Sequence, residues 1–354
     1  MAGCITISDI KPLAQRGDRP IVIAGPCSAE TESQTLSTAK ALSSIGVKIY
    51  RAGLWKPRTL PGSFEGVGDQ GLEWLQRVKS ETGMSVATEV ATAQHVEAAL
   101  AAGIDILWVG ARTTANPFAM QSIADALSGH DEVTMLVKNP VNPDLDLWMG
   151  ALQRLLNAGL TRVGAVHRGF SSASNPIYRN DPQWHIPFEL RRHSPEMTIL
   201  CDPSHIGGKR ELIEPLVQQA LDMGFDGLMI ESHCDPDHAL SDSAQQITPD
   251  ALKKILDRVV VRSGAPIEDE LALLRQQIDD CDHELLVLLA RRMSVSREIG
   301  AFKKAHNLQV LQPQRYQAVI NNRLDEGERL DLGRDFVKQL MQTIHEESVR
   351  QQLE

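Results

Sequence analysis

Residues 85–110 read SVATEVATAQHVEAALAAGIDILWVG. A strand-like run, Ser85–Glu89, is followed by an Ala- and Glu-rich stretch, Thr92–Ala102, and then by a second strand-like run, Asp105–Gly110. A strand, a helix and a further strand in this order are typical of a parallel βα unit. This segment therefore predicts an α/β fold.

The same alternation extends through the first three quarters of the chain. Eight strand-like runs occur, at Ile21–Gly25, Val47–Arg51, Ser85–Glu89, Asp105–Gly110, Val133–Lys138, Val163–His167, Thr198–Asp202 and Gly227–Glu231. Helix-like stretches lie between them, for example Pro143–Ala158. Eight such units in about 250 residues predict a (β/α)8 TIM barrel. A doubly wound open sheet is the alternative, and the absence of GxGxxG after the first run argues against its dinucleotide-binding form.

The pattern changes at the sequence SGAP, residues 263–266, after which no convincing strand follows. Apolar residues then recur at helical spacing and predict one long helix, Ile267–Ala305. Two shorter helices are expected around Pro313–Leu324 and Gly333–Gln352. So long a helix exceeds the usual length in a globular domain and indicates helix pairing between protomers. The expected divisions are a barrel over 1–262, a linker over 263–266 and a small all-α domain over 267–354.

Composition limits the classes of function. The 354 residues carry a formal net charge of −10 and no long basic run, which argues against nucleic-acid binding. Five cysteines without CxxC spacing are typical of reduced thiols. The sequence has neither a secretory signal pattern nor an apolar run of about 20 residues. We therefore expect a cytoplasmic protein with no membrane partner.

Polar groups follow seven of the eight strand-like runs, where a TIM barrel carries its catalytic side chains. Six of these groups are cationic: Arg51, Lys56, Arg58, Arg112, Lys138 and Arg168. Any one of them could be a surface salt bridge, but six at one barrel mouth predict a site for small polyanions. Arginine matches phosphate and carboxylate in a bidentate manner, and lysine adds a point charge.

A second set of strand-end residues combines a thiol, an imidazole and two carboxylates. Its members are Cys27, His205, Glu231 and Asp242. This mixture of ligands fits a divalent metal of borderline hardness, such as Mn²⁺, Fe²⁺, Co²⁺ or Zn²⁺. The alternative for Cys27 is a buried structural thiol. Three further histidines lie near strand ends and are not assigned as ligands: His167, His233 and His238.

Residues 1–262 resemble the compact type I-β 3-deoxy-D-arabino-heptulosonate 7-phosphate (DAHP) synthases. The matching strings are GPCS at 25–28, RAGLWKPRT at 51–59, GARTT at 110–114, VKNP at 137–140, HRG at 167–169, DPSHIGGKR at 202–210, and IESH at 230–233 with ALSD at 239–242. The sister enzyme that makes the eight-carbon analogue, KDO8P synthase, shares an opening similar to GPCS. The string KPRT at residues 56–59 favours DAHP synthase over that alternative.

The resemblance implies the first step of the shikimate pathway, which leads to the aromatic amino acids. Phosphoenolpyruvate and erythrose 4-phosphate would condense, with a metal acting as Lewis acid on the aldehyde. The implied metal ligands are Cys27, His205, Glu231 and Asp242. Phosphoenolpyruvate would bind to Arg112, Lys138 and Arg168, with Arg51 and Lys56 nearby, and erythrose 4-phosphate to Arg58 and Thr59. The implied catalytic residues are Cys27, Lys56, Lys138 and His205.

The long predicted helix carries three cationic residues. Arg292 and Lys303 are eleven residues apart and share a face, whereas Arg275 lies about 25 Å and about 260° away from Arg292. One helix cannot bring all three to a small ligand, but two antiparallel copies could. The spacing therefore predicts a homodimer through the helical domain. The alternative is three solvated charges on an amphipathic helix.

The string LLRQQIDDCDHELLVLLARRMSVSREIGAFKK at 273–304 resembles the first helix of the all-helical AroQ-type chorismate mutases. The likeness continues through 312–315 and 345–352, and it implies rearrangement of chorismate to prephenate. The implied ligand-binding residues are Arg275, Arg292, Lys303, Arg315, Ser348 and Gln352. The family usually has acidic residues where this chain has Gln312 and Tyr316. An alternative is therefore a sensor domain with weak mutase activity that regulates the barrel.

Overall fold

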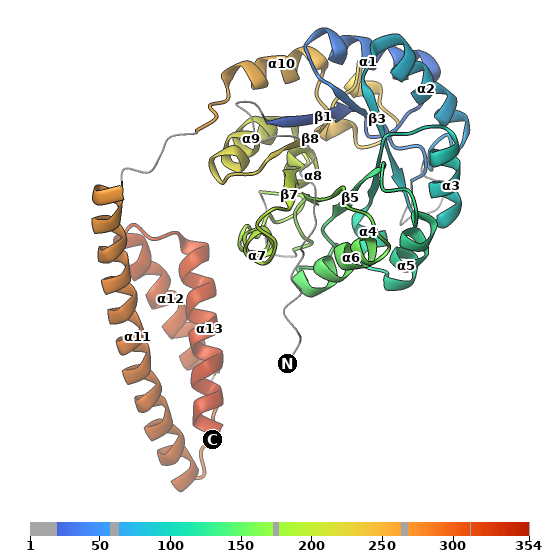
Figure 1. Cartoon of the computed structure of the whole chain (residues 1–354). Coiled ribbons are helices and arrows are strands. Elements are labelled where there is room, and N and C mark those ends of the chain that lie inside the picture. Colours follow the sequence, from blue (N-terminus) through green and yellow to red (C-terminus); the bar gives the residue numbers. More distant parts are fainter. Residues whose placement is uncertain (1–19, 57–63, 173–176, 263–267, 312, 354) are drawn as a thin grey trace. The chain divides into compact units, whose positions relative to one another are not determined.

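A computed structural model describes residues 20–56, 64–172, 177–262, 268–311 and 313–353. The chain divides into two units, Met1–Ser263 and Gly264–Glu354. The first unit is built of strands and helices, and the second consists of helices (Figure 1).

Eight parallel strands close into a barrel in the order of the chain. They are β1 (Ile21–Gly25), β2 (Ile49–Arg51), β3 (Ser85–Val90), β4 (Ile106–Val109), β5 (Thr134–Lys138), β6 (Val163–His167), β7 (Thr198–Cys201) and β8 (Gly227–Glu231). β1 pairs with both β2 and β8, and the Gly25↔Glu231 pair closes the ring. The predicted barrel is confirmed, and each strand begins and ends within two residues of its expected run.

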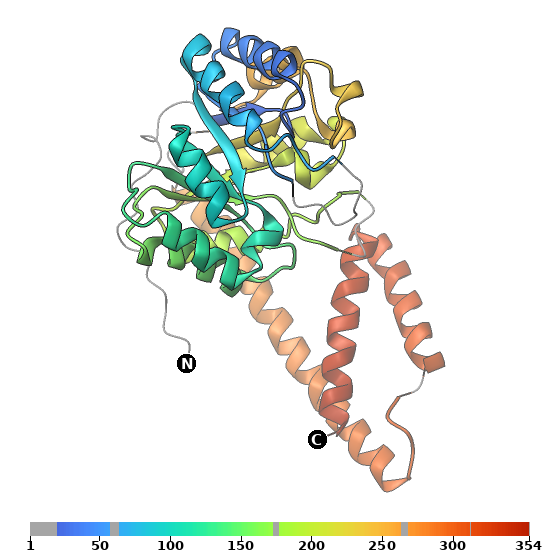
Figure 2. The same cartoon turned by 90° about the vertical axis from the view of Figure 1, so that its right-hand side faces the viewer.

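Helices surround the strands (Figure 2). They are α1 (Glu32–Ser44), α2 (Gln70–Thr82), α3 (Ala93–Ala101), α4 (Ala111–Thr114), α5 (Pro117–Ala126), α6 (Leu145–Asn157), α7 (His185–His193), α8 (Pro203–Gly207), α9 (Ile213–Asp222) and α10 (Pro249–Arg258), with short 3-10 turns η1 (Arg210–Leu212), η2 (Pro236–His238) and η3 (Ser243–Gln245). Side-chain caps start several of them; for example, Thr248 accepts from the Ala251 amide at the start of α10. α10 ends at Arg258, because the β-branched residues from Val259 onward favour extended backbone.

The barrel has an inner and an outer core. The inner cluster lies among the strands and consists of Ile23, Ala87, Ile106, Trp108, Leu136, Val166, Leu200 and Met229. The outer, larger cluster lies between the strands and the helices. Alternating strand side chains serve the two clusters, as expected when strands are covered on both sides. The inner cluster therefore fills the barrel interior below the strand-end residues, which lie at the barrel mouth.

The described residues of the second unit form three helices, α11 (Glu268–Ala305), α12 (Pro313–Arg329) and α13 (Arg334–Leu353). α13 lies alongside both α11 and α12 (Figures 1 and 2). Many apolar side chains of α11 are exposed: Leu274, Ile278, Leu285, Leu286, Leu288, Val295, Ile299 and Phe302. Within the described ranges, no helix is both long enough and apolar enough to cross a bilayer.

Candidate functional site

The ends of β1 and β2 approach each other closely at the barrel mouth. Gly25 ends β1 with a φ of +153°, and a Cβ atom there would lie 2.0 Å from the carbonyl oxygen of Arg51. Only glycine fits this contact. The close approach brings the loop that follows β1, with Cys27, next to the end of β2.

Three oxygen and sulfur donors meet at this point. Cys27, Glu231 and Asp242 each offer one ligand atom, and these atoms lie within 4.8 Å of one another. The Cys27 thiol donates to Asp242 Oδ2 at 3.2 Å. Asp242 has a φ of +49°, a left-handed conformation that is uncommon for residues other than glycine. Chain segments from both ends of the barrel sequence therefore converge on one small cluster.

His205, the fourth residue of the predicted metal set, lies beside this cluster. Its Nε2 atom is 3.7 Å from Glu231 Oε1, and its Nδ1 atom is 2.8 Å from Asp202 Oδ2. Asp202 also caps α8 by accepting from the backbone amide of His205 at 3.0 Å. A carboxylate on one imidazole nitrogen leaves the other free to face a metal, an arrangement that is common around metal ions.

The chemistry of these residues fits a divalent cation. Glu231 is buried, and its Oε1 atom accepts no hydrogen bond from the described residues. Burial, reinforced by the negative charge of Glu231, raises the pKa of the Cys27 thiol to about 12. A bound cation would reverse this effect, because it stabilises the thiolate and the carboxylates together. Bringing these residues together therefore costs free energy when no cation is present and is favourable when a cation lies between them.

Two cationic side chains border the donor cluster. Arg51 is buried, with Nη2 3.3 Å from Glu231 Oε1 and its guanidinium 4.8 Å from the centre of the Trp108 ring. Lys56 donates from Nζ to Cys27 Sγ at 3.0 Å. Burial opposes the charged form of Lys56, but the nearby Cys27 and carboxylates outweigh it and raise the pKa of this lysine. Both side chains carry positive charge into the barrel mouth.

Lys138, at the end of β5, forms a buried ion pair with Asp202, at 2.7 Å between Nζ and Oδ2. Despite burial, the adjacent His205 and Lys138 hold the pKa of the Asp202 carboxyl well below its usual range. Arg168 donates to Asn180 Oδ1 at 2.6 Å, and burial lowers the pKa of its guanidinium to about 10. The charges at the floor of the mouth are thus fixed by buried partners.

The remaining predicted cations differ in what the structure describes. Arg112 lies on α4, directly after β4, and its side chain is exposed. Arg58 and Thr59 lie outside the described residues. The structure therefore brings Arg51 and Lys56 to the donor cluster. It pairs Lys138 with Asp202, which also contacts His205, and leaves Arg112 exposed after the end of β4.

Several polar residues at this mouth were not assigned from the sequence. Asp202 pairs with two predicted residues, and Arg179 donates to both Asp242 Oδ1, at 3.1 Å, and Gln245 Oε1, at 2.5 Å. Glu89 accepts from the Trp108 indole at 3.3 Å. The strand-end rule could have identified Asp202 and Glu89, because both terminate predicted runs. Arg179 lies in a loop and Gln245 in the 3-10 turn η3, and no local signal identifies them.

A second polar cluster lies between α11 and α13. Arg292 donates to the Ser348 hydroxyl and, at 3.4 Å, to the carbonyl oxygen of Ile344. Lys303 donates to Gln352 Oε1 at 3.0 Å. The helices approach closely here: a Cβ atom on Gly300 would lie only 2.7 Å from Gln352 Cα. Four of the six predicted chorismate-binding residues therefore pair across facing helices, Arg292 with Ser348 and Lys303 with Gln352.

The other two predicted residues of the helical unit lie apart from this cluster. Arg275 and Arg315 are exposed, and within the described part of the chain no hydrogen bond joins either one to the four. Tyr316 is half-buried and its ring lies 4.4 Å from that of His345. Burial, followed by the positive charge of Arg292, lowers the pKa of His345. An aromatic pair thus occupies the region where an acidic residue was expected from the resemblance.

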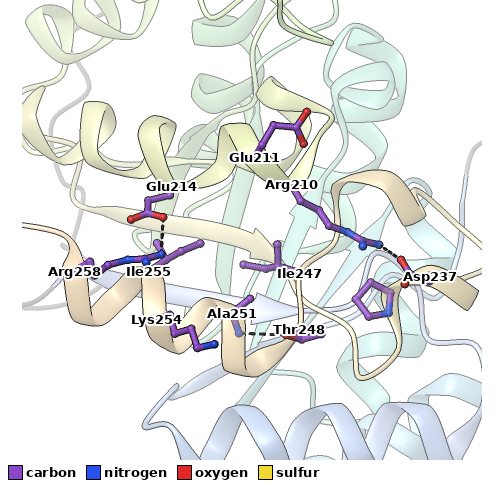
Figure 3. A pocket seen from close by; sticks show the side chains of 11 residues that line it. Arg210, Glu211, Glu214, Asp237, Ile247, Thr248, Ala251, Lys254, Ile255 and Arg258 are labelled. Carbon is purple, nitrogen blue, oxygen red and sulfur yellow. Dashed lines mark hydrogen bonds and ion pairs between the residues drawn. The ribbon is translucent and has the colours of Figure 1, made fainter.

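A cavity of about 460 Å³ is lined by residues of η1, α9, η2 and α10, and none of the three donors is among its lining residues (Figure 3). Two ion pairs cross its walls, Arg210–Asp237 at 2.7 Å and Arg258–Glu214 at 2.6 Å. Apolar side chains such as Ile247 line its base. Paired charges therefore form part of the cavity wall, beside apolar residues.

Comparison with protein families gives two matches. The model described as the DAHP synthetase I family matches residues 6–262, and the model described as chorismate mutase type II matches residues 274–353. The two matches correspond to the two structural units. The three-helix unit is thus matched to an all-helical mutase, as the resemblance of its sequence implies.

Comparison with individual proteins agrees with the first match. A phospho-2-dehydro-3-deoxyheptonate aldolase of Thermotoga maritima is 34% identical over 238 residues, which cover 67% of this chain and 68% of the relative. A 2-dehydro-3-deoxyphosphooctonate aldolase of Geobacter sulfurreducens is 30% identical over 274 residues, which cover 72% and 96%. The crystal structure of a DAHP synthase from Thermotoga maritima is similar with a TM-score of 0.62 and 29% identity, covering 70% of this chain and 72% of that one.

Proposed function

Because the chain belongs to the DAHP synthetase I family, we propose that its barrel condenses phosphoenolpyruvate with D-erythrose 4-phosphate to DAHP and phosphate. The two family matches support both a DAHP synthase and a chorismate mutase activity. The observation that carries the proposal is the cluster of Cys27 and Glu231, both buried, with the partly buried Asp242, bordered by Arg51 and Lys56. This reaction is the first step of the shikimate pathway.

Cys27, His205, Glu231 and Asp242 would hold one divalent cation, with Mn²⁺, Fe²⁺, Co²⁺ and Zn²⁺ as candidates. When bound, such a cation supplies Lewis acidity toward a carbonyl oxygen. Asp202 orients the imidazole of His205 through its contact at 2.8 Å. Gln245 donates to Glu231 Oε2 at 2.7 Å. Oε1, which accepts no hydrogen bond from the described residues and lies 3.3 Å from Arg51 Nη2, is the atom proposed to contact the cation.

The cationic residues carry the charge balance of the proposed reaction. In that reaction C3 of phosphoenolpyruvate bonds to the aldehyde carbon, a water oxygen adds at C2, and the C2–O bond to phosphate breaks. Lys138, Arg168 and Arg112 would bind the phosphate and carboxylate of phosphoenolpyruvate, with Arg51 and Lys56 nearby. Fixed charges in a buried site stabilise the transition state because they need no reorganisation. Arg58 and Thr59 are proposed for erythrose 4-phosphate.

The helical unit would rearrange chorismate to prephenate. This reaction is unimolecular, so a site needs only to hold the compact dicarboxylate and stabilise charge at the ether oxygen. Arg292, Lys303, Ser348 and Gln352 offer two cations, a hydroxyl and an amide on facing helices. Arg315 is proposed as a further contact of the same ligand.

A homodimer through the helical unit would add Arg275 from a second copy to this site. The exposed apolar side chains of α11 support this proposal, since they would be covered by a second helix. The spacing of Arg275 from Arg292 supports it independently. The division into a catalytic barrel over 1–262, a linker over 263–266 and a mutase domain over 267–354 is part of the same proposal, as is a cytoplasmic location.

The second candidate for the helical unit is a sensor that binds chorismate or prephenate and regulates the barrel, with weak turnover. The Tyr316–His345 pair favours this candidate, because it occupies a position where the family usually has an acidic residue. Covalent linkage would let the ligand state of one unit bias the other. Regulation would appear as a synthase rate that changes when prephenate is added, and an unchanged rate would exclude it.

The second candidate for the barrel is a related KDO8P-type synthase. The 30% identity to the 2-dehydro-3-deoxyphosphooctonate aldolase of Geobacter sulfurreducens keeps this candidate open. The KPRT string at residues 56–59 favours erythrose 4-phosphate. Assays with erythrose 4-phosphate and arabinose 5-phosphate in parallel distinguish the two, since each candidate predicts a different preferred aldehyde.

The proposed function is tested by removing metal from the full chain with a chelator and restoring it. Phosphate release from phosphoenolpyruvate and erythrose 4-phosphate is expected to stop on removal and to return with added Mn²⁺ or Co²⁺. Chorismate consumption by the same sample is expected to stay constant, because the proposed rearrangement is unimolecular and needs no metal. A synthase rate that persists after complete metal removal would contradict the proposal.

A further inference from the structure

The loop that follows β8 contacts the proposed metal donors through hydrogen bonds to Cys27 and Glu231. It carries Asp242 itself and two glutamines. Gln246 Oε1 accepts from the backbone amide of Cys27 at 2.9 Å, and Gln245 donates to Glu231 Oε2 at 2.7 Å. The position of this loop therefore decides whether the three donors meet.

Arg210, in the 3-10 turn η1, holds the backbone of this loop. Its Nε atom donates to the Gln246 carbonyl oxygen at 2.7 Å, and its Nη2 atom donates to the Ser243 carbonyl oxygen at 2.9 Å. The same Nη2 atom lies 2.7 Å from Asp237 Oδ1, in the wall of the cavity between α9 and α10 (Figure 3). One guanidinium thus joins η2 to the segment on which Asp242 lies.

The backbone at Asp242 needs such support. Its left-handed conformation is unfavourable for a side chain with a Cβ atom, and it persists only where neighbouring contacts impose it. The contacts of Arg210 lie one and four residues beyond Asp242. The planar guanidinium with several fixed N–H groups can hold two carbonyl oxygens at once, which a lysine cannot reproduce.

We propose that Arg210 is a positioning residue of the metal site: it fixes the loop after β8 so that Asp242 and Gln246 meet Cys27. It acts through the loop, because its hydrogen bonds go to backbone carbonyl oxygens of that loop. The inference rests on the proposed metal-dependent function and adds to it a residue that is neither a ligand nor a substrate contact. Loss of Arg210 should therefore weaken metal binding more than substrate binding.

A matched control lies in the same cavity. Arg258 pairs with Glu214 at 2.6 Å across the wall, and among the described residues it donates to no atom of the loop. Arg210→Gln and Arg258→Gln each remove one cation and one ion pair from the cavity. Only the first change removes the two hydrogen bonds to the loop, so the pair separates positioning from general stabilisation.

The test is a Co²⁺ titration of the metal-free full chain, followed by the absorbance of the cobalt–thiolate bond. We expect Arg210→Gln to raise the Kd for Co²⁺ about 10- to 100-fold, the usual effect of losing a partner behind a metal ligand. Arg258→Gln should change the Kd less than about threefold, and Arg210→Lys should be intermediate. At saturating metal, the KM for phosphoenolpyruvate of Arg210→Gln should stay near that of the unaltered chain.

The outcomes separate the inference from the proposed function. An unaltered chain that gives no cobalt–thiolate absorbance would overturn both. Normal binding by the unaltered chain, with the same Kd in Arg210→Gln or an equal loss in Arg258→Gln, would overturn the inference alone. Circular dichroism verifies that each variant folds. If Arg210→Gln does not fold, the Kd of Arg210→Lys for Co²⁺ is measured instead. An unchanged Kd in that variant would also overturn the inference.

Discussion

Gly300→Ala would force apart the two helices that carry the proposed mutase site. A Cβ atom at Gly300 would lie 2.7 Å from both Cα and the carbonyl oxygen of Gln352, whereas ordinary contacts begin at 3.4 Å. These are backbone atoms, so they cannot turn aside as the end of a flexible side chain could. The helices α11 and α13 must therefore separate locally by about 0.7 Å.

The expected magnitude follows from two opposing terms. Overpacking a close contact costs about 1–3 kcal/mol, whereas replacing glycine by alanine within a helix gains about 1 kcal/mol. We therefore expect a net destabilisation of the helical unit of about 0–2 kcal/mol. The shift also displaces the Lys303–Gln352 hydrogen bond of 3.0 Å. Since a misplacement of about 1 Å can cost about 100-fold in rate, chorismate turnover should fall about 10- to 100-fold.

Both activities are measured on the same full-length sample, and the synthase rate should stay within twofold. Gly150→Ala is the matched control, because Gly150 lies within helix α6 and a Cβ atom there meets nothing within 4 Å. That change should stabilise the barrel by about 0.5–1 kcal/mol and leave both rates unaltered. If Gly300→Ala instead stabilised the helical unit and kept full chorismate turnover, the close contact of α11 with α13 would have no part in the site.

Three further predictions concern single residues. Burial lowers the pKa of His167 to about 3, so folded His167 stays neutral while an unfolded histidine gains a proton below about pH 6.5. The stability that His167 contributes is complete above pH 6.5 and falls by about 1.4 kcal/mol per pH unit below it. Between pH 7.5 and 5, the thermal midpoint of the barrel should therefore fall less in His167→Gln than in the unaltered chain. An equal fall in the two proteins would contradict this. Asp202→Asn removes the partner of Lys138 and should lower the synthase kcat about 10- to 100-fold in steady-state assays, whereas a change below twofold would exclude the pairing as important. Arg292→Ala should reduce chorismate turnover about 100-fold or more with an unchanged synthase rate, and loss of both rates would indicate general unfolding instead.

The barrel could be predicted from the sequence because its signals are local. Each strand is a short apolar run, and the residue that ends it must lie at the mouth when parallel strands close a ring. This reasoning identifies Arg51, Lys138 and Glu231 without knowledge of any contact. Helix α11 could also be located within one residue, because apolar residues recur at helical spacing and glycine and proline are nearly absent over its length.

The support around the donor cluster could not be predicted in this way. Arg210 and Gln246 meet only because the loops after β7 and β8 lie side by side in the closed barrel. The left-handed conformation at position 242 could not be predicted either, because the residue there is aspartate and not glycine. Contacts between loops depend on the geometry of the whole ring, and residue type alone does not specify them.

The exposed apolar side chains of α11 make the helical unit sensitive to protein concentration. If a second copy covers residues such as Leu285, Leu288 and Phe302, the folded unit is stabilised by mass action. Its melting temperature would then rise as the sample is concentrated, while that of the barrel would stay constant. Dilution alone would slow chorismate turnover per chain before it affected DAHP synthesis, so the ratio of the two rates would report how much of this enzyme is present.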